Sequence, residues 1–87
     1  KYLGNPSNMQ FDIIFIDPPY DLPNNEIEKL LRKIINNNFL NENGIIAVER
    51  ESRSKEFIWQ EPLVGTKVRG YGQGSIYYGG YSASVNP

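Results

Sequence analysis

The feature that most constrains the fold is an apolar run, Phe11–Ile16, followed directly by Asp17-Pro18-Pro19-Tyr20. A nearly continuous apolar run of this length is typical of a parallel strand that is covered on both faces. Two consecutive prolines cannot extend that strand, because neither has a backbone N–H and both have a fixed φ. The chain is therefore expected to leave the sheet at Asp17, at the carboxyl edge, where ligands bind in open α/β sheets.

An amphipathic helix is expected after this turn. Asn24 is a candidate N-cap, and Asn36-Asn37-Asn38 ends the pattern. Phe39 and Leu40 are expected to pack beneath the end of the helix. The apolar residues with helical spacing are Ile27, Leu30, Leu31, Ile34 and Ile35.

A second short strand, Ile45–Val48, is expected after the turn residues Asn43-Gly44. Strand, helix and strand span residues 11–48, which is the size of one βαβ crossover. The two strands are therefore expected to be parallel, with a right-handed connection. The mainly charged segment 49–55 follows at the same carboxyl edge as Asp17. The apolar residues 57–59 are expected to cover the sheet.

The last third of the chain predicts an antiparallel hairpin, with strands Val64–Arg69 and Ser75–Tyr81 joined by the glycine-rich loop 70–74. Glycine-rich loops bind nucleotides when they follow a strand and open a helix. Here another strand follows, so we interpret the glycines as a hairpin loop. The predicted fold is α/β, a parallel strand–helix–strand unit followed by an antiparallel hairpin. Three tyrosines are expected to pack or to pair across strands: Tyr77, Tyr78 and Tyr81.

Length and composition narrow the possible functions. The chain has 87 residues with no cysteine and no histidine, which argues against disulfides, thiolate metal sites and the commonest general base. No metal is expected. A net charge of −1 gives no general attraction to nucleic acid. No apolar run approaches the roughly 20 residues of a membrane span, and a cytoplasmic protein is the simplest interpretation.

The chain also has features of a part of a longer protein. It begins at Lys1, its only methionine is Met9, and residues 1–10 have a loop composition. A parallel sheet of two strands would leave open edges and bare faces. We therefore expect further strands on the amino-terminal side, or a second copy of the chain against the open edge.

The turn at residues 17–20 contains groups that suit an exocyclic amine on a base. Such an amine is a poor nucleophile because its lone pair is delocalised into the ring. A carboxylate and a backbone carbonyl that accept its two N–H bonds favour a pyramidal nitrogen and stabilise the positive charge that develops on it. Tyr20 can stack on the base. The alternative is an ordinary strand-ending turn in which Tyr20 only packs.

The segment Phe11–Tyr20 resembles motif IV of the S-adenosylmethionine-dependent amino-methyltransferases, which include adenine-N6 DNA enzymes and guanine-N2 RNA enzymes. Most of residues 9–81 are similar to the RsmD family of 16S ribosomal RNA guanine-N2 methyltransferases. The resemblance includes the helix, Asn43-Gly44 before Ile45–Glu49, and the ending Lys67-Val68-Arg69, Tyr71-Gly72 and Ile76-Tyr77-Tyr78. It implies the C-terminal half of a Rossmann-like class I methyltransferase sheet.

The resemblance also implies roles for the residues of the turn. Asp17 and the Pro18 carbonyl would bind the guanine amine, Tyr20 would hold the base, and Pro19 would keep the turn rigid. The methyl donor would be S-adenosylmethionine, but the family's glycine-rich loop after the first strand and the acidic residue that ends the second are absent from this chain. Residues 1–87 are thus expected to be a partial methyltransferase domain that lacks the cofactor-binding strands and is inactive alone.

The expected partner is ribosomal RNA or the small ribosomal subunit. Arg50, Arg53 and Lys55 could contact RNA phosphates from the carboxyl edge. The interleaved glutamates at 49, 51 and 56 fit a solvated loop equally well. Two other functions stay open at this point: an adenine-N6 DNA methyltransferase, and a non-catalytic α/β module that binds a nucleotide or a partner.

Overall fold

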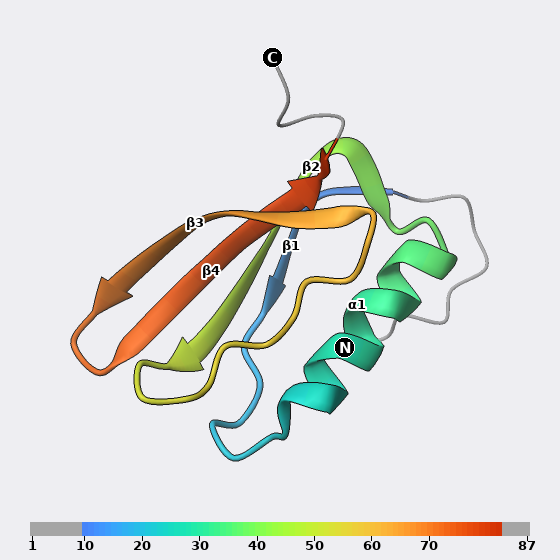
Figure 1. Cartoon of the computed structure of the whole chain (residues 1–87). Helices are drawn as coiled ribbons and strands as arrows, with labels where there is room; N and C mark the ends of the chain where they lie inside the picture. Colours follow the sequence, from blue (N-terminus) through green and yellow to red (C-terminus); the bar gives the residue numbers. More distant parts are fainter. Residues whose placement is uncertain (1–9, 83–87) are drawn as a thin grey trace.

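The computed structural model describes residues 10–82, which form a four-stranded sheet with a helix packed on one face (Figure 1). The strand order is β1-β2-β4-β3. β1 and β2 are parallel, whereas β4 is antiparallel to both of its neighbours. The predicted strand–helix–strand unit followed by a hairpin is confirmed. The elements are β1 (Phe11–Ile16), α1 (Asn24–Asn36), β2 (Leu40–Glu51), β3 (Leu63–Tyr71) and β4 (Gly74–Tyr81).

Strand β2 is longer than predicted, because it passes through Asn43-Gly44, where a turn was expected. Phe11 pairs with Leu40 and Ile13 pairs with Ile45, so Asp12 alone lies opposite residues 41–44. The sheet absorbs the extra residues as an irregularity instead of ending. Asp12 accepts a hydrogen bond of 2.8 Å from the Asn41 amide there, which explains a carboxylate within an apolar strand.

Helix α1 packs its apolar stripe against the sheet, as predicted. Ile27, Leu31 and Ile34 are fully buried, and Phe39 and Leu40 are buried beneath the helix end. The prediction of Asn24 as N-cap is wrong, since the cap position is Pro23, which makes no side-chain cap hydrogen bond. The Asn24 side chain is used elsewhere: its Nδ2 donates to the carbonyl of Lys55 at 2.9 Å.

The segment between β2 and β3 covers the rest of the helix-bearing face. Phe57 is buried with its ring 5.3 Å from that of Tyr77, and Trp59 packs against the same core. A Cβ atom on Gly79 would lie 2.6 Å from the Trp59 ring, so the glycine makes room for the indole. The expected cover is thus confirmed for Phe57 and Trp59, whereas Ile58 is exposed.

The hairpin is confirmed but tighter than predicted. The ladder continues to the pair Tyr71–Gly74, so that only Gly72 and Gln73 turn the chain. Gly72 has φ +48°, which favours glycine. Of the three tyrosines, Tyr77 is buried as expected, and Tyr78 is half-buried with the Lys67 amine 5.4 Å from its ring centre.

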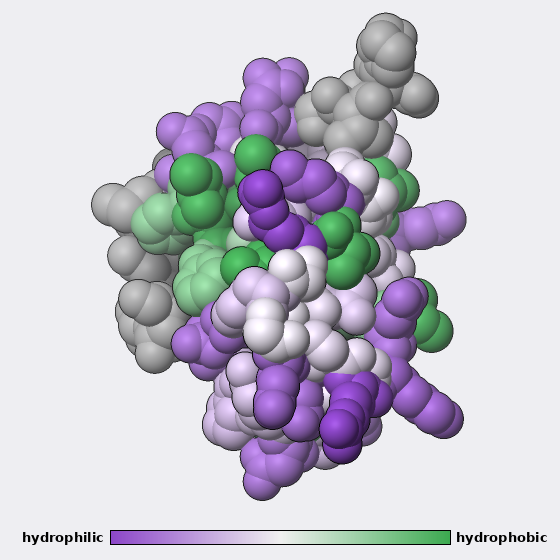
Figure 2. Space-filling model, turned by 90° about the vertical axis from the view of Figure 1, so that its left-hand side faces the viewer, coloured by the Kyte–Doolittle hydropathy of each residue, from purple (hydrophilic) through white to green (hydrophobic). Residues whose placement is uncertain are grey.

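The sheet face opposite α1 is open, although β1 was expected to be covered on both sides. Four apolar side chains with exposed fractions between 41% and 67% form what we call the exposed apolar face: Phe11, Ile13, Phe15 and Ile45. Figure 2 shows hydrophobic surface gathered in patches and bordered by hydrophilic side chains. None of the helices in residues 10–82 combines the length and apolar character that crossing a membrane requires.

Candidate functional site

The turn at residues 17–20 lies where the carboxyl ends of two parallel strands meet. Ile16 and Val48 form the last pair of the β1–β2 ladder. Asp17 and Glu49 are therefore the next residues on neighbouring strands, with backbones about 5 Å apart. The β3–β4 hairpin closes beside them, because Glu51 of β2 pairs with Gly74 of β4. This edge thus gathers three segments that are distant in the sequence.

The turn presents a carboxylate and an aromatic ring to solvent. The Leu22 N–H donates to the Pro19 carbonyl at 3.1 Å, which closes a turn with Tyr20 and Asp21 at its centre. Asp17 is exposed, and Tyr20 is 46% exposed. The arrangement can therefore receive a flat ligand without first uncovering either side chain.

Arg50 supports the turn from inside the protein. It is only 3% exposed, and its Nη2 donates to the Leu22 carbonyl at 2.8 Å and to Asn24 Oδ1 at 3.1 Å. Its Nη1 donates to the Pro19 carbonyl at 3.5 Å, and its buried Nε has no hydrogen-bond partner among residues 10–82. Arg50 was predicted to contact RNA phosphates, and this burial is incompatible with that role because the guanidinium faces the protein interior.

Arg53 and Lys55 are exposed in the segment that follows β2. The Lys55 carbonyl is bonded to Asn24, which places this segment beside the start of α1 and the turn. Both side chains are free to reach solvent at the carboxyl edge. Their contact with RNA phosphates stays a prediction.

A contact between Glu49 and Tyr71 was not predicted from the sequence. The Tyr71 hydroxyl donates to a carboxylate oxygen of Glu49. A Cβ on Gly74 would lie 3.0 Å from the Tyr71 ring, so the ring crosses over this glycine to reach β2. Only the register of β2, β4 and β3 brings Glu49 and Tyr71 together. The one sequence signal for this contact is a glycine that faces an aromatic residue across the hairpin.

The electrostatics of this contact link it to the turn. The hydrogen bond to Glu49 raises the pKa of Tyr71 to about 12, and desolvation and the negative charges of Glu49, Tyr20 and Asp17 add to the effect. Asp17 and Tyr20 therefore lie within electrostatic range of Tyr71. The Tyr71 hydroxyl therefore stays protonated at neutral pH and keeps its hydrogen bond to Glu49.

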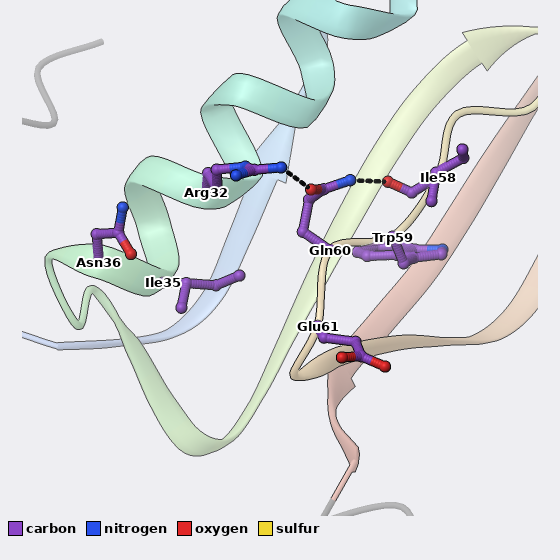
Figure 3. A pocket seen from close by; sticks show the side chains of 7 residues that line it. All are labelled: Arg32, Ile35, Asn36, Ile58, Trp59, Gln60 and Glu61. Atoms are coloured by element: carbon purple, nitrogen blue, oxygen red, sulfur yellow. Dashed lines mark hydrogen bonds between the residues drawn. The ribbon is translucent and has the colours of Figure 1, made fainter.

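A separate groove of about 460 Å³ lies over the last turns of α1 (Figure 3). Arg32 Nη2 donates to Gln60 Oε1 at 2.8 Å, and Gln60 Nε2 donates to the Ile58 carbonyl at 2.9 Å. The carboxyl-edge turn precedes the first turn of α1, so the groove lies at the other end of the helix and is not part of the site. Its lining residues are Arg32, Ile35, Asn36, Ile58, Trp59, Gln60 and Glu61.

Two kinds of binding feature among the described residues bear on a metal or a cofactor: a group of metal ligands, and a glycine-rich loop that opens a helix. Within residues 10–82, no group of three or more His, Cys, Asp or Glu could hold a metal ion. The glycine-rich sequence 70–74 closes the β3–β4 hairpin and does not open a helix. The structure thus places Asp17, Pro18, Pro19 and Tyr20 together at a solvent-facing edge, with no nucleotide loop beside them in this part of the chain.

Known proteins share both this sequence pattern and this fold. A family model described as "Conserved hypothetical protein 95" matches residues 1–80. The "Uncharacterized methylase RP545" of Rickettsia prowazekii (strain Madrid E) is 33% identical over 81 residues, which are 93% of this chain and 33% of that protein.

Solved structures of methylases are also similar to this chain. The "putative methylase HI0767" of Haemophilus influenzae superposes with a TM-score of 0.69 at 32% identity, over 88% of this chain and 47% of that one. The rRNA methyltransferase aviRa of Streptomyces viridochromogenes shares the fold, with a TM-score of 0.63 at 22% identity, over 91% of this chain and 32% of that one.

The chain spans a third of the length of its curated relative and just under half of the first solved structure. The match of the family model and the identity to RP545 extend over nearly all of residues 1–87. The mixed α/β sheet of this chain superposes on those solved structures. The chain belongs to the conserved hypothetical protein 95 family, which is the RsmD family of methyltransferases.

Proposed function

We propose that this chain carries the acceptor half of a methyltransferase site that methylates the exocyclic N2 amine of a guanine in small-subunit ribosomal RNA. The observation that supports it most is the turn at residues 17–20, with an exposed carboxylate and an exposed ring at the carboxyl edge of the sheet. The chain belongs to a methyltransferase family, which indicates that the reaction at this turn is methyl transfer. S-adenosylmethionine is the proposed methyl donor.

The turn's own groups account for activation of the amine. Asp17 accepts one N–H of the amine and the Pro18 carbonyl accepts the other, which leaves the nitrogen lone pair directed away from the ring. Both oxygens stabilise the positive charge that forms on nitrogen during attack. Tyr20 stacks on the base, and Pro19 restricts the backbone between them.

The methyl donor supplies an electron-poor methyl group on a sulfonium. We assign none of residues 10–82 to holding it. Transfer is direct: the bond from the amine nitrogen to the methyl carbon forms as the methyl–sulfur bond breaks, and the donor leaves as a neutral thioether. The methylated nitrogen then loses one proton to solvent, and no covalent intermediate forms with the protein.

Glu49 favours guanine over adenine at this edge. The Watson–Crick edge of guanine has an N1–H donor beside its exocyclic amine, whereas the N1 of adenine is an acceptor beside its own. A second carboxylate next to Asp17 attracts the guanine N1–H and repels the adenine N1 lone pair. A ribosomal substrate is supported by an rRNA methyltransferase with the same fold, and by the exposed cations Arg53 and Lys55.

The test uses the complete gene product that contains residues 1–87. Labelled S-adenosylmethionine is offered with ribosomal RNA, assembled small subunits and duplex DNA, and the products are digested to nucleosides. We expect label in N2-methylguanosine from an RNA substrate. Label in N6-methyladenine from DNA would support the adenine-specific alternative instead.

Calorimetry separates an enzyme from a binding module. S-adenosylmethionine is titrated into the 87-residue chain and into the complete gene product. We expect binding to the complete product only. No binding to either protein, together with no methyl transfer, would reject the proposal in favour of the non-catalytic module.

A further inference from the structure

We propose that Arg50 is a positioning residue, which fixes from inside the protein the turn that presents Tyr20 and so sets where a base lies relative to Asp17. The kinetic consequence of this inference rests on the proposed function. Its structural part, that Arg50 immobilises the turn, does not.

The turn needs such support because its sequence provides few backbone donors. Pro18 and Pro19 have no N–H, so this stretch cannot be held by a backbone ladder. Tyr20 is 46% exposed, and a ring that packs so little takes its orientation mainly from the backbone that carries it. What the turn does offer is acceptors, namely the carbonyl oxygens of Pro19 and Leu22.

Arg50 meets these acceptors at both ends of the turn. Pro19 and Leu22 are the residues whose mutual hydrogen bond closes the turn, and Arg50 donates to the carbonyls of both. The planar guanidinium has donors in a fixed fork, and a lysine ammonium cannot span the same set of oxygens. Neither Arg50 nor the turn can therefore shift without lengthening these contacts.

The third contact extends the support to neighbouring segments. Asn24 is the first residue of α1, and it accepts from Arg50 while donating to the Lys55 carbonyl. One side chain on β2 thus ties together the turn, the start of α1 and the segment after β2.

The charge of Arg50 points to the same role. Among the described residues no carboxylate forms an ion pair with it; the ion pair found there joins Lys29 to Glu26. A buried cation is costly unless polar groups surround it. The carbonyl oxygens of the turn are the main groups that stabilise the buried Arg50 cation. The cation therefore needs the turn to keep its geometry, and the turn needs the cation to hold its carbonyl groups in place.

The experiment compares Arg50→Lys and Arg50→Met in the complete gene product with the matched control Arg32→Met. Arg32 also bonds to a distant segment, through Gln60, but at the other end of α1. Amide hydrogen exchange of residues 20–25 is followed by mass spectrometry, together with the melting temperature. We expect exchange there to become about tenfold faster or more in both Arg50 variants, because a charge-assisted contact is lost, with no change in the control.

The kinetic readout separates positioning from stability. Single-turnover methyl transfer at saturating substrates is expected to fall about tenfold or more in both Arg50 variants, with the KM for the methyl donor unchanged. Added guanidinium ion is expected to restore part of the rate in Arg50→Ala. A residue that only stabilised the fold would give no such rescue.

Three results would overturn the inference. The first is that folded Arg50 variants exchange the amides of residues 20–25 at the wild-type rate. The second is that these variants transfer the methyl group at the wild-type single-turnover rate. The third is a uniform rise in exchange over the whole protein without guanidinium rescue.

Two other outcomes are separable from these. If wild type transfers no methyl group, the proposed function fails, and the exchange measurement alone decides whether Arg50 immobilises the turn. If the Arg50 variants do not fold, Asn24→Ala removes one acceptor, and local exchange at residues 20–25 unchanged from wild type would reject the role.

Discussion

Tyr71 reaches the candidate site because the residue opposite it across the hairpin is a glycine. The ring passes over Gly74 and its hydroxyl binds Glu49 two strands away. The chemistry of this edge therefore depends on side chains from β2 and β3 as well as on the turn after β1. The hydroxyl donates its one proton to Glu49, and the remaining lone pairs of that carboxylate stay available as acceptors at the site.

The pH dependence of Tyr71 gives a direct test of this contact. Glu49 raises the pKa of Tyr71 from 10.0 to about 12. The protonated hydroxyl is the form that the folded protein favours, so the contact stabilises the fold fully below pH 10. That stabilisation is lost as the pH rises from about 10 to about 12.

We expect ultraviolet titration of the tyrosines to lose a component near pH 12 in Tyr71→Phe. Stability should fall more steeply between pH 10 and 12 in wild type than in this variant. Tyr78→Phe is the control, and its titration should keep the component near pH 12. Loss of a component near pH 10 instead, with the same pH dependence of stability in wild type and Tyr71→Phe, would show that the contact with Glu49 is not formed.

Single residues show where sequence reasoning succeeds and where it does not. Asp17, Pro18, Pro19 and Tyr20 could be placed at the edge because they follow a strand directly, and local rules decide such positions. Arg50 was expected either to contact RNA phosphates or to lie in a solvated loop, because charged side chains are mostly exposed. Both expectations place it in solvent, whereas it is buried and donates to backbone carbonyls about thirty residues earlier in the chain. That environment is set by tertiary contacts, which no local pattern contains.

At the level of elements, the predicted order and types were right, and the boundaries were the weaker part. Asn43-Gly44 has turn composition and lies in the irregularity opposite Asp12, but Leu40 before it and Ile45 after it both pair with β1, so β2 continues through it. The hairpin loop was expected over five residues, and the ladder continued to Tyr71 and Gly74. In the hairpin the ladder outweighed the local preference of glycine, and in β2 the pairing of the flanking residues did so.

The cover of the sheet by Trp59 predicts the effect of a small substitution. A Cβ on Gly79 would lie 2.6 Å from the indole and 2.7 Å from the Val64 carbonyl, so Gly79→Ala forces the two strands or the indole apart. We expect it to lower the free energy of unfolding by about 1–3 kcal/mol.

Gly70→Ala is the matched control for this prediction, because the nearest atom to its Cβ would be at 3.9 Å. Chemical denaturation of both variants measures the difference. Equal stabilities of Gly79→Ala and wild type would contradict the packing of Trp59 against β4.

At the scale of the whole molecule, the distribution of apolar surface is uneven. One face of the sheet is covered by α1 and the segment after β2, and the exposed apolar face lies on the other side of β1 and β2. Apolar side chains that remain so accessible in neighbouring strands favour association. The 87-residue chain, with a mass of 10.0 kDa, is therefore expected to self-associate when it is studied alone.

Light scattering tests this expectation. Ile13→Lys with Phe15→Lys places two charges on the exposed apolar face and should shift the chain towards the monomer. Val68→Lys is the control, because Val68 is similarly exposed but shares a register row with Tyr77 and Val48 on the other side of the sheet. A monomeric wild-type chain would reject self-association through this face.

The central claim is that the Asp17 carboxylate activates an amine for methylation. The most direct measurement is single-turnover methyl transfer to ribosomal RNA by the complete gene product and its Asp17→Ala variant, with Asp21→Ala as a control carboxylate in the same turn. We predict a loss of about 100-fold or more for Asp17→Ala, unchanged binding of the methyl donor, and near wild-type transfer for Asp21→Ala. Equal transfer by wild type and Asp17→Ala would contradict the account.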